Sequence, residues 1–356
     1  MDSGEGELKY FEITNMHRMV KMLEPKARLE MVTKDTFEIV TLQELESLLI
    51  TNVNPKSYWG VAPTGPPHIG YYRAISKQMD LVNAGFKHKI LIADMHAYLD
   101  DRKSPWEEIE LRGKIYEMCF RLLGLDKNVE YIYGHTFQYS KEYVNNLYKL
   151  MPLITVTRAT RAASEVCRME DPKVSQLVYP LMQILDCVEL DVDVAYGGID
   201  QRHVYMLGRE CLPLIGARKP ILIFTPLGIG LSGKGKMSAS KKKERLELFA
   251  DPKKIEEKIA SAFCPQNEVK DNPILEYVKY LIFPRIEKFV IEREKKYGGD
   301  IEFKTFDELC DQYKKGNIHP YDLKKATARY LIEILKPLRD YFEKHNDMLK
   351  VYQHEL

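Results

Sequence analysis

The sequence predicts an α/β protein: a doubly wound parallel sheet with a helical insertion, followed by an all-helical C-terminal domain. Two patterns support this prediction. Short apolar runs alternate with stretches of helical periodicity up to about residue 225, and residues 134–190 and 244–356 are almost entirely helical in pattern. Strands that alternate with helices pair in parallel through right-handed crossovers, which gives a doubly wound sheet.

Five apolar runs predict the strands of this sheet. They lie at residues 57–61, 89–93, 129–133, 192–195 and 221–224. Apolar side chains at helical spacing predict the helices between them, at Ile69, Tyr72, Ile75 and Met79 and at Ile109, Ile115, Cys119 and Leu122. The insertion at 134–190 separates the third and fourth strands, where we expect the strand order to reverse. Ligands of such sheets bind at this point.

Capping residues predict where several helices begin. Thr41 with Glu44 forms a capping box, Ser104 precedes Pro105 at a helix start, and Asp251 precedes a proline in the same way. Near the end, residues 323–338 have the periodicity of one long amphipathic helix. We therefore expect a Rossmann-like domain over 1–243 and a helical domain over 244–356.

Composition narrows the possible functions. The hydrophobic share of 45% and the charged share of 29% are ordinary for a globular protein. Lys and Arg number 53 against 52 Asp and Glu, so nucleic-acid contacts must come from a local patch. The six cysteines are widely spaced without a C-x-x-C pair, which argues against a zinc site or a disulfide framework. No apolar run has the length of a membrane span, and the first thirty residues are too charged for a signal peptide.

Two glycine-containing segments are candidate nucleotide-binding loops. Residues 63–71 (PTGPPHIGY) follow the first strand and enter a helix, whose free amide groups favour phosphate. The missing side chain at Gly70 allows an adenine ring to lie against the backbone. The second segment, residues 235–240 (GKMSAS), places Lys234 and Lys236 where they can reach a triphosphate. A structural turn and an ordinary basic loop are the alternative interpretations.

A third glycine turn follows the fourth strand. Residues 196–202 (YGGIDQR) place Gly198 at the carboxyl end of this strand. Asp200 is a candidate acceptor for both ribose hydroxyls, and Gln201 is a candidate ligand for a substrate ammonium group. A solvated β-turn is the alternative.

Tyr179, Gln183 and Asp186 form a polar stripe at positions i, i+4 and i+7, so they share one helix face. Such a stripe is costly when it is buried without partners. A ligand with a polar group at each end would satisfy it, and so would a network of side chains internal to the fold.

Together, these segments resemble a known family. Residues 63–71 and 235–240 resemble the HIGH and KMSKS signatures of class I aminoacyl-tRNA synthetases, in the right order. Over essentially its whole length the chain resembles the tyrosyl-tRNA synthetases of the archaeal and eukaryotic cytosolic type. The matching segments are residues 93–99 (ADMHAYL), 137–138 (FQ), 179–186 (YPLMQILD), 197–202 (GGIDQR) and 319–324 (HPYDLK).

The resemblance implies a role for each matching residue. Tyr58 and Asp186 would hold the phenol hydroxyl of tyrosine, and the ammonium would be held by Tyr179, Gln183 and Gln201, with His96 and Gln138 nearby. The implied ATP-binding residues are Gly60, Ala62, His68, Gly70, Gly198, Asp200, Lys236, Met237 and Ser238. Catalysis would rest on stabilisation of charge at phosphorus by His68, Lys234 and Lys236.

The resemblance also implies the reaction. Tyrosine would attack ATP to form tyrosyl-adenylate, and the acyl group would pass to the 3′ end of tRNA(Tyr), with Mg²⁺ entering on ATP. Tyr71 and Ser240 depart from the two signatures, which puts phosphate contacts at these positions in doubt. Tryptophanyl-tRNA synthetases share both signatures and are the alternative. Their substrate, however, has no phenol hydroxyl for Tyr58 and Asp186 to bind. A non-catalytic RNA-binding paralogue is a third interpretation, which the intact motif residues disfavour.

RNA-binding residues are expected in two places. Arg158, Arg161 and Arg168 recur in the insertion and are candidates for contacts with acceptor-stem phosphates, although a solvated basic face is equally consistent with them. In the C-terminal domain the resemblance implies that Tyr297 stacks on the first anticodon base, with His319 and Asp322 at the edge of that base. Helix capping is the alternative for these three. A homodimer in the cytoplasm, without a membrane contact, is also expected.

Overall fold

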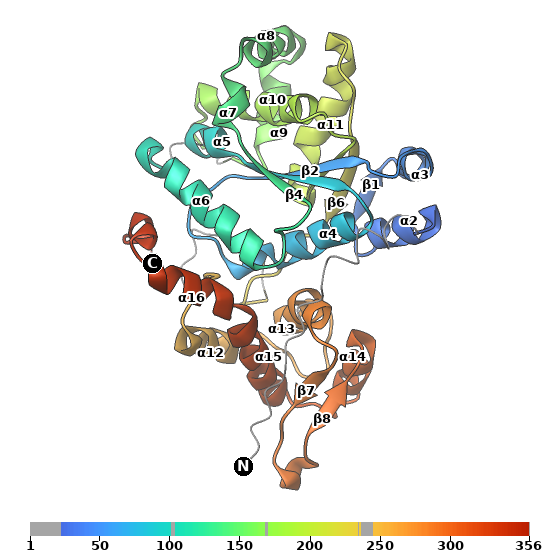
Figure 1. Cartoon of the computed structure of the whole chain (residues 1–356), viewed down its shortest axis with the longest axis vertical. Helices are drawn as coiled ribbons and strands as arrows, with labels where there is room; N and C mark the ends of the chain where they lie inside the picture. Colours follow the sequence, from blue (N-terminus) through green and yellow to red (C-terminus); the bar gives the residue numbers. More distant parts are fainter. Residues whose placement is uncertain (1–22, 101–103, 168–169, 234, 236–244, 356) are drawn as a thin grey trace. The chain divides into compact units, whose positions relative to one another are not determined.

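The computed structural model describes residues 23–100, 104–167, 170–233, 235 and 245–355 of the chain. These residues divide into two compact units (Figure 1). Residues 68–76 and 228–346 form what we call the C-terminal unit, and the other described residues form the sheet unit. The domain boundary predicted at residue 243 lies outside the described residues and stays a prediction.

The described part of the sheet unit contains a six-stranded sheet with the order β1-β6-β5-β2-β3-β4. Its strands are β1 (Glu38–Val40), β2 (Lys56–Val61), β3 (Lys87–Ile92), β4 (Val129–Tyr133), β5 (Val194–Gly198) and β6 (Ile221–Thr225). From β2 the next strands along the chain, β3 and β4, are added successively on one side, and β5 then pairs with the other side of β2. The strand order therefore reverses between β2 and β5, as predicted.

Strands β2 to β6 correspond to the five predicted strands, although β5 begins two residues later than expected. The predicted doubly wound sheet is confirmed, with β2 to β6 all parallel; β1, which the sequence did not predict, adds one antiparallel edge strand beside β6. This edge strand has only three residues, all half-buried. Such a short segment has too little alternation to be recognised in a sequence.

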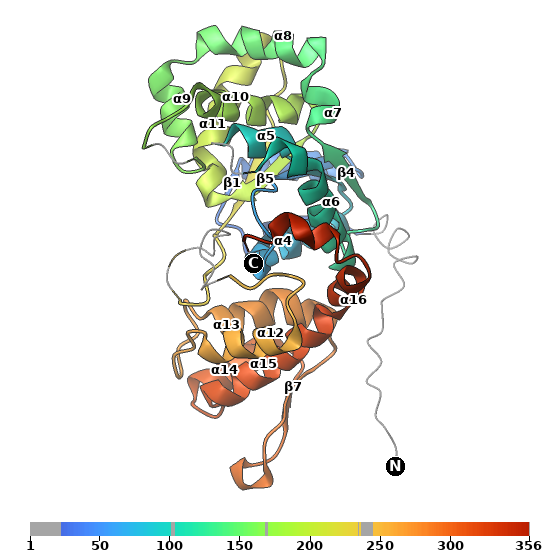
Figure 2. The ribbon, with the colours of Figure 1, turned by 90° about the vertical axis from the view of Figure 1, so that its left-hand side faces the viewer.

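Helices cover both faces of this sheet, with α6 on one face and α10 and α11 on the other (Figures 1 and 2). The helices of this region are α2 (Pro25–Thr33), α3 (Leu42–Thr51), α4 (Tyr72–Asn83), α5 (Asp94–Leu99), α6 (Trp106–Leu122), α7 (His135–Gln138), α8 (Lys141–Leu150), α9 (Val156–Ala163), α10 (Val174–Glu189) and α11 (Arg202–Cys211). The predicted insertion is real: α7 to α10 lie between β4 and β5. Its helices share one core with α11, which includes Leu150 and Leu181 of the insertion and Leu207 of α11.

The predicted helix starts are confirmed at α3 and corrected at α6. Thr41 and Glu44 form the reciprocal capping box, with the Glu44 amide donating to Thr41 Oγ1 at 3.2 Å. Ser104 does not cap α6, which begins at Trp106 without a side-chain cap. The buried Ser104 hydroxyl instead donates to the carbonyl of Pro63 at 2.7 Å and supports the loop after β2.

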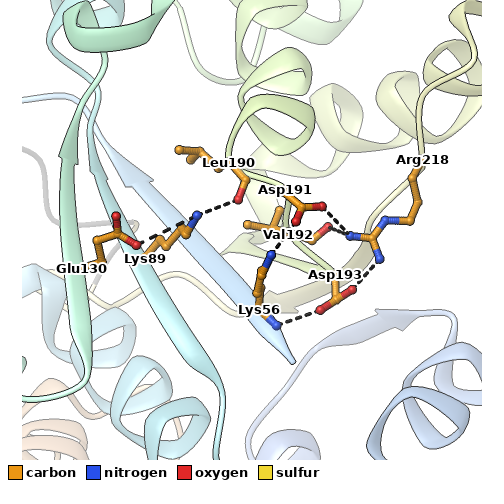
Figure 3. Close-up of polar contacts among 8 residues, drawn as sticks. All are labelled: Lys56, Lys89, Glu130, Leu190, Asp191, Val192, Asp193 and Arg218. Carbon is orange, nitrogen blue, oxygen red and sulfur yellow. Dashed lines mark hydrogen bonds and ion pairs between the residues drawn. The ribbon is translucent and has the colours of Figure 1, made fainter. Parts of the chain in front are cut away.

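A network of charged residues fixes the turn between α10 and β5 (Figure 3). Asp193 accepts a hydrogen bond from the amide of Lys56 at 2.8 Å, and it forms an ion pair with Arg218. Lys89 donates to the carbonyl of Leu190 at 2.8 Å. Lys56 is the first residue of β2, and Lys89 lies within β3. These bonds therefore set the position of the end of α10 relative to the sheet.

The C-terminal unit is mainly helical, but the prediction that it is all-helical is wrong. Its helices are α12 (Pro252–Ser261), α13 (Pro273–Tyr277), α14 (Phe306–Lys314), α15 (Pro320–Ile334) and α16 (Lys336–Lys344). Strands β7 (Phe289–Ile291) and β8 (Ile301–Phe303) form an antiparallel pair. Phe289 and Ile291 are buried on alternate positions, and Gly298 and Gly299 take positive φ angles that the connecting turn requires.

Two further predictions concern this unit. Asp251 caps α12 as expected, accepting a hydrogen bond from the Lys254 amide at 2.8 Å. The single long helix expected over 323–338 is instead two helices, since α15 ends at Ile334 and a proline occupies the first turn of α16.

Among the helices described, none combines the length and the apolar character needed to cross a membrane.

Candidate active site

The buried carboxylate of Asp186 is the centre of the candidate site, on the sheet-facing side of α10. One of its oxygens, Oδ1, accepts two hydrogen bonds of 2.8 Å, from Gln138 Nε2 and from the hydroxyl of Tyr143. The other oxygen, Oδ2, has no hydrogen-bond donor among the described residues. The nearest ring nitrogen, His96 Nε2, lies 3.7 Å away.

Several other polar atoms beside Asp186 are also buried without hydrogen-bond partners within the described residues. They are Gln138 Oε1 and the ring nitrogens of His96, whose ring has only a weak contact with the backbone of Tyr179. Buried polar atoms are nearly always hydrogen-bonded in folded proteins, and each exception costs about 1–3 kcal/mol. A carboxylate oxygen and an amide oxygen that lack donors, beside a weakly bonded imidazole, therefore mark a binding site for a polar group, with a donor placed at Asp186 Oδ2.

Burial controls the charge of this pocket. It raises the pKa of Asp186 to about 7, against the opposing effect of the hydrogen bonds from Gln138 and Tyr143. It also lowers the pKa of His96 to about 4, so the imidazole is neutral at pH 7. At pH 7 the pocket thus holds one carboxyl group that is about half ionised, among neutral groups, which suits an uncharged hydroxyl partner.

The helices that carry His96 and Gln138 are fixed to each other by Asp94. Its Oδ1 accepts hydrogen bonds from the amides of Met95 at 2.7 Å and His135 at 3.0 Å, and its Oδ2 pairs with the His135 ring. These bonds join the first residues of α5 and α7. His96 and Gln138 follow within one turn, so both side chains reach Asp186.

Tyr58 on β2 lies in the same buried cluster but does not bond to Asp186. Its hydroxyl pairs with that of Tyr205 at 2.8 Å, and it also lies 3.4 Å from the carbonyl of Gln183. Burial raises the pKa of Tyr58 well above its ordinary value, so the phenol stays protonated. The prediction that Tyr58 and Asp186 share a ligand hydroxyl is untested by these contacts.

The structure also brings together the three residues expected at the ammonium end. Gln183 Nε2 donates to Gln201 Oε1 at 3.0 Å. The ring of Tyr179 packs edge-on against His96, with centroids 4.6 Å apart. Gln183 is therefore in direct contact with Gln201, and Tyr179 lies beside His96, whose Nε2 is 3.7 Å from Asp186.

The glycine turns lie at the carboxyl ends of the neighbouring parallel strands β2 and β5. Gly60 and Ala62 belong to the first, Gly198 and Asp200 to the second. A side chain at Gly198 would place its Cβ 2.7 Å from both Asp200 Oδ1 and Leu227 Cδ2, so both side chains would have to move to admit it. Ligands bind at this edge of doubly wound sheets.

In the C-terminal unit, His68 begins the 3₁₀ turn that precedes α4, and Gly70 follows in that turn. Its Nδ1 accepts the Gly70 amide at 3.2 Å, and its ring stacks on Tyr71 with centroids 4.8 Å apart. Burial and the nearby Arg245 lower the pKa of His68 to about 4. His68 is therefore a neutral N–H donor through Nε2 at pH 7.

Four of the predicted site residues lie outside the described residues: Lys234, Lys236, Met237 and Ser238. Arg168 does as well. Among the residues that are described, no group of three or more His, Cys, Asp or Glu side chains is arranged to hold a metal ion.

The predicted RNA-binding residues that the structure describes are on the surface or partly exposed. Arg158 on α9 forms an ion pair with Glu210, whereas Arg161 on the same helix is exposed. Exposed Tyr297 precedes the turn between β7 and β8. His319 caps α15, with Nδ1 accepting the Tyr321 amide at 3.2 Å, which is the alternative that the sequence left open.

Asp322 lies in the first turn of α15, just after the cap. Arg293 bridges the loops that carry Tyr297 and His319, because it donates to the carbonyls of Gly299 at 3.0 Å and Asn317 at 3.2 Å. These contacts keep the two loops side by side, which the proposed reading of one base by both loops requires.

Two tyrosines that position the pocket were missed in the sequence. Tyr143 holds Asp186, and Tyr205 holds Tyr58. Tyr205 lies four residues after Gln201, on one face of α11, which is a weak signal. Tyr143 sits in a helix whose pattern identifies it only as a core residue.

Comparisons with known proteins agree with this geometry. Residues 51–336 match the family model described as tRNA synthetases class I (W and Y), so the fold and site define a class I tRNA synthetase. The chain is 45% identical over 323 residues to the tyrosine–tRNA ligase of Natronomonas pharaonis, covering 88% of this chain and 93% of that protein. The ligase of Archaeoglobus fulgidus is 43% identical over 314 residues, covering 88% and 96%.

Solved structures agree as well. The tyrosyl-tRNA synthetase of Archaeoglobus fulgidus, solved in complex with L-tyrosine, superimposes with a TM-score of 0.85 at 42% identity, covering 89% of this chain and 99% of that one. A tryptophanyl-tRNA synthetase from Aeropyrum pernix has a TM-score of 0.71 at 17% identity, which shows a shared fold only. The chain belongs to the tyrosine–tRNA ligase family, archaeal type.

We predict that the stability of the unliganded protein falls relative to that of Asp186→Asn as the pH rises from about 4 to about 7. The folded protein raises the pKa of Asp186 from 3.8 to about 7, so in this window the unfolded chain releases a proton that the folded chain keeps. The difference should change by about 2–4 kcal/mol and then stay constant up to pH 8. Urea unfolding of both proteins across this range measures it, and parallel pH profiles would contradict the assignment.

Proposed function

We propose that this chain activates L-tyrosine with ATP and transfers it to the 3′ end of tRNA(Tyr), with Asp186 as the residue that selects the phenol. The observation that carries the proposal is the buried Asp186 Oδ2, which lacks a donor among the described residues and lies beside neutral His96. A phenol O–H supplies the donor that this oxygen needs. A substrate without it leaves Asp186 unpaired, and tyrosine-specific synthetases are the standard example of such rejection.

The chemistry requires alignment more than activation. The tyrosine carboxylate is already a nucleophile; it attacks the α-phosphorus of ATP, and pyrophosphate leaves with the electrons of the P–O bond. A terminal ribose hydroxyl of the tRNA then displaces AMP from the adenylate. We assign to Tyr179, Gln183 and Gln201 the task of fixing the ammonium, so that the carboxylate keeps one direction.

At the nucleotide, we assign Gly60, Ala62, Gly70 and Gly198 to close backbone contact with ATP, and Asp200 to the ribose. His68 would donate an N–H to a phosphate oxygen as charge develops, while Lys234 and Lys236 supply positive charge, with Met237 and Ser238 in the same loop. Mg²⁺ would enter on ATP, held by its phosphates.

For the tRNA, we assign Arg158 and Arg161 to acceptor-stem phosphates, and Tyr297, His319 and Asp322 to an anticodon base. The link through Arg293 supports the second assignment. The ion pair between Arg158 and Glu210 weakens the first, since this pair must open before Arg158 reaches a phosphate. A cytoplasmic location is proposed from family membership.

We predict that Lys236→Ala lowers tyrosine-dependent ATP–pyrophosphate exchange about 10²–10³-fold while tyrosine binding is unchanged, because Lys236 acts on phosphate and not on the amino acid. Lys288→Ala removes an exposed lysine paired with Glu302 and serves as the control. Nearly normal exchange in Lys236→Ala would contradict the role of that lysine. Wild-type protein that exchanges with tryptophan instead of tyrosine would contradict the proposed function.

We also propose that two copies pair through an exposed apolar face of the insertion. This face consists of large apolar side chains that are 37–69% exposed. They lie on α8, on α9 and on the two 3₁₀ turns Met151–Leu153 and Leu212–Ile215, and both of these turns contact α8. Its members are Tyr148, Met151, Leu153, Val156 and Leu214. A face of this kind paired with its own copy buries apolar surface on both sides at once.

We predict that Val156→Asp shifts the protein from dimer to monomer, because the substitution would bury a charge in the apolar interface. Ile50→Asp on α3, which changes an equally exposed side chain outside this face, should leave the dimer intact. Sedimentation velocity at micromolar concentration distinguishes the two species. A dimer that survives the Val156 change would place the interface elsewhere.

A further inference from the structure

Residues 245–248 form a buried segment of the C-terminal unit that is extended up to Glu247 and then enters a turn. Leu246 and Leu248 are 0% and 1% exposed, and the alternate residues Arg245 and Glu247 are each 2% exposed. The segment is bound to the turn that carries His68. The amide of Ile69 donates to the carbonyl of Leu246 at 2.8 Å, and His68 and Glu247 form an antiparallel bridge.

An ion pair lies inside this segment. Arg245 Nε donates to Glu247 Oε1 at 2.8 Å, and Glu247 Oε2 pairs with Lys254 Nζ at 2.8 Å. Residues two apart in extended backbone project to the same side, so the pair closes without distortion. Burying two charges is expensive, and well-packed apolar residues of similar volume usually stabilise a fold at least as well. The pair is thus poorly explained by stability alone.

His68 is the neighbour that this pair influences. The charges of Arg245 and Glu247 both act on the imidazole, in opposite directions. On its other flanks the ring is fixed by the Gly70 amide and by Tyr71. The position of His68 is therefore determined on one side by its own turn and on the other by the segment that the ion pair holds in place.

We propose that Arg245 and Glu247 are positioning residues for the activation step: their buried ion pair holds segment 245–248 against the His68 turn and so fixes the direction of the His68 N–H donor. The proposal rests on the proposed function. A donor displaced by a fraction of an ångström no longer matches the oxygen on which charge develops, so catalysis should suffer more than binding.

The double variant Arg245→Met/Glu247→Met tests the proposal. It removes both charges together and keeps apolar volume, so neither partner is left buried and unpaired. Lys254 is 35% exposed and remains solvated. We expect kcat for tyrosine-dependent pyrophosphate exchange to fall at least tenfold, with the KM for tyrosine and its calorimetric Kd within twofold of wild type. Arg245→Lys, which can keep the ion pair, should recover most of kcat.

Arg339→Met is the matched control. Arg339 is another buried arginine of the same unit, and it donates to the carbonyl of Ile332 on α15. Its loss should lower the melting temperature and leave kcat unchanged. The proposal is overturned if the double variant keeps the wild-type kcat, or if it loses fold and tyrosine binding together, since the pair would then be purely structural. Absence of exchange in wild-type protein would instead refute the proposed function.

Discussion

The pocket depends on one carboxylate that is satisfied on one side only. Two donors within the fold occupy Asp186 Oδ1, and none among the described residues reaches Oδ2. A protein keeps such an atom buried only when the surrounding packing enforces it. Here the enforcement comes from α10, whose end is tied to the sheet by the charged network around Asp193 and Lys56, and from Asp94, which joins α5 to α7.

Burial sets the electrostatics of both units in the same way. It keeps His96 and His68 neutral at pH 7, so each serves as a hydrogen-bonding group and neither as a charge. The positive charge that phosphoryl chemistry needs must therefore come from lysines and from Mg²⁺ on ATP. Because His68 is neutral, it can lie against the buried Arg245 without a large electrostatic cost.

The sequence predicted those features that depend on periodicity. The spacing of Tyr179, Gln183 and Asp186 placed them on one face, and alternating apolar runs located five of the six described sheet strands. Tyr143 and Tyr205 were missed because contacts between distant segments, and not local pattern, bring them to Asp186 and Tyr58. The β7–β8 pair was missed because three-residue strands carry almost no periodic signal.

The most direct test is a crystal structure of this chain with L-tyrosine bound. The account predicts a phenol oxygen about 2.5–3.0 Å from Asp186 Oδ2, the range of an O–H···O bond, with the ammonium beside Gln183 and Gln201. Tyrosine bound in another orientation, or a phenol oxygen that leaves Asp186 Oδ2 unpaired, would contradict it.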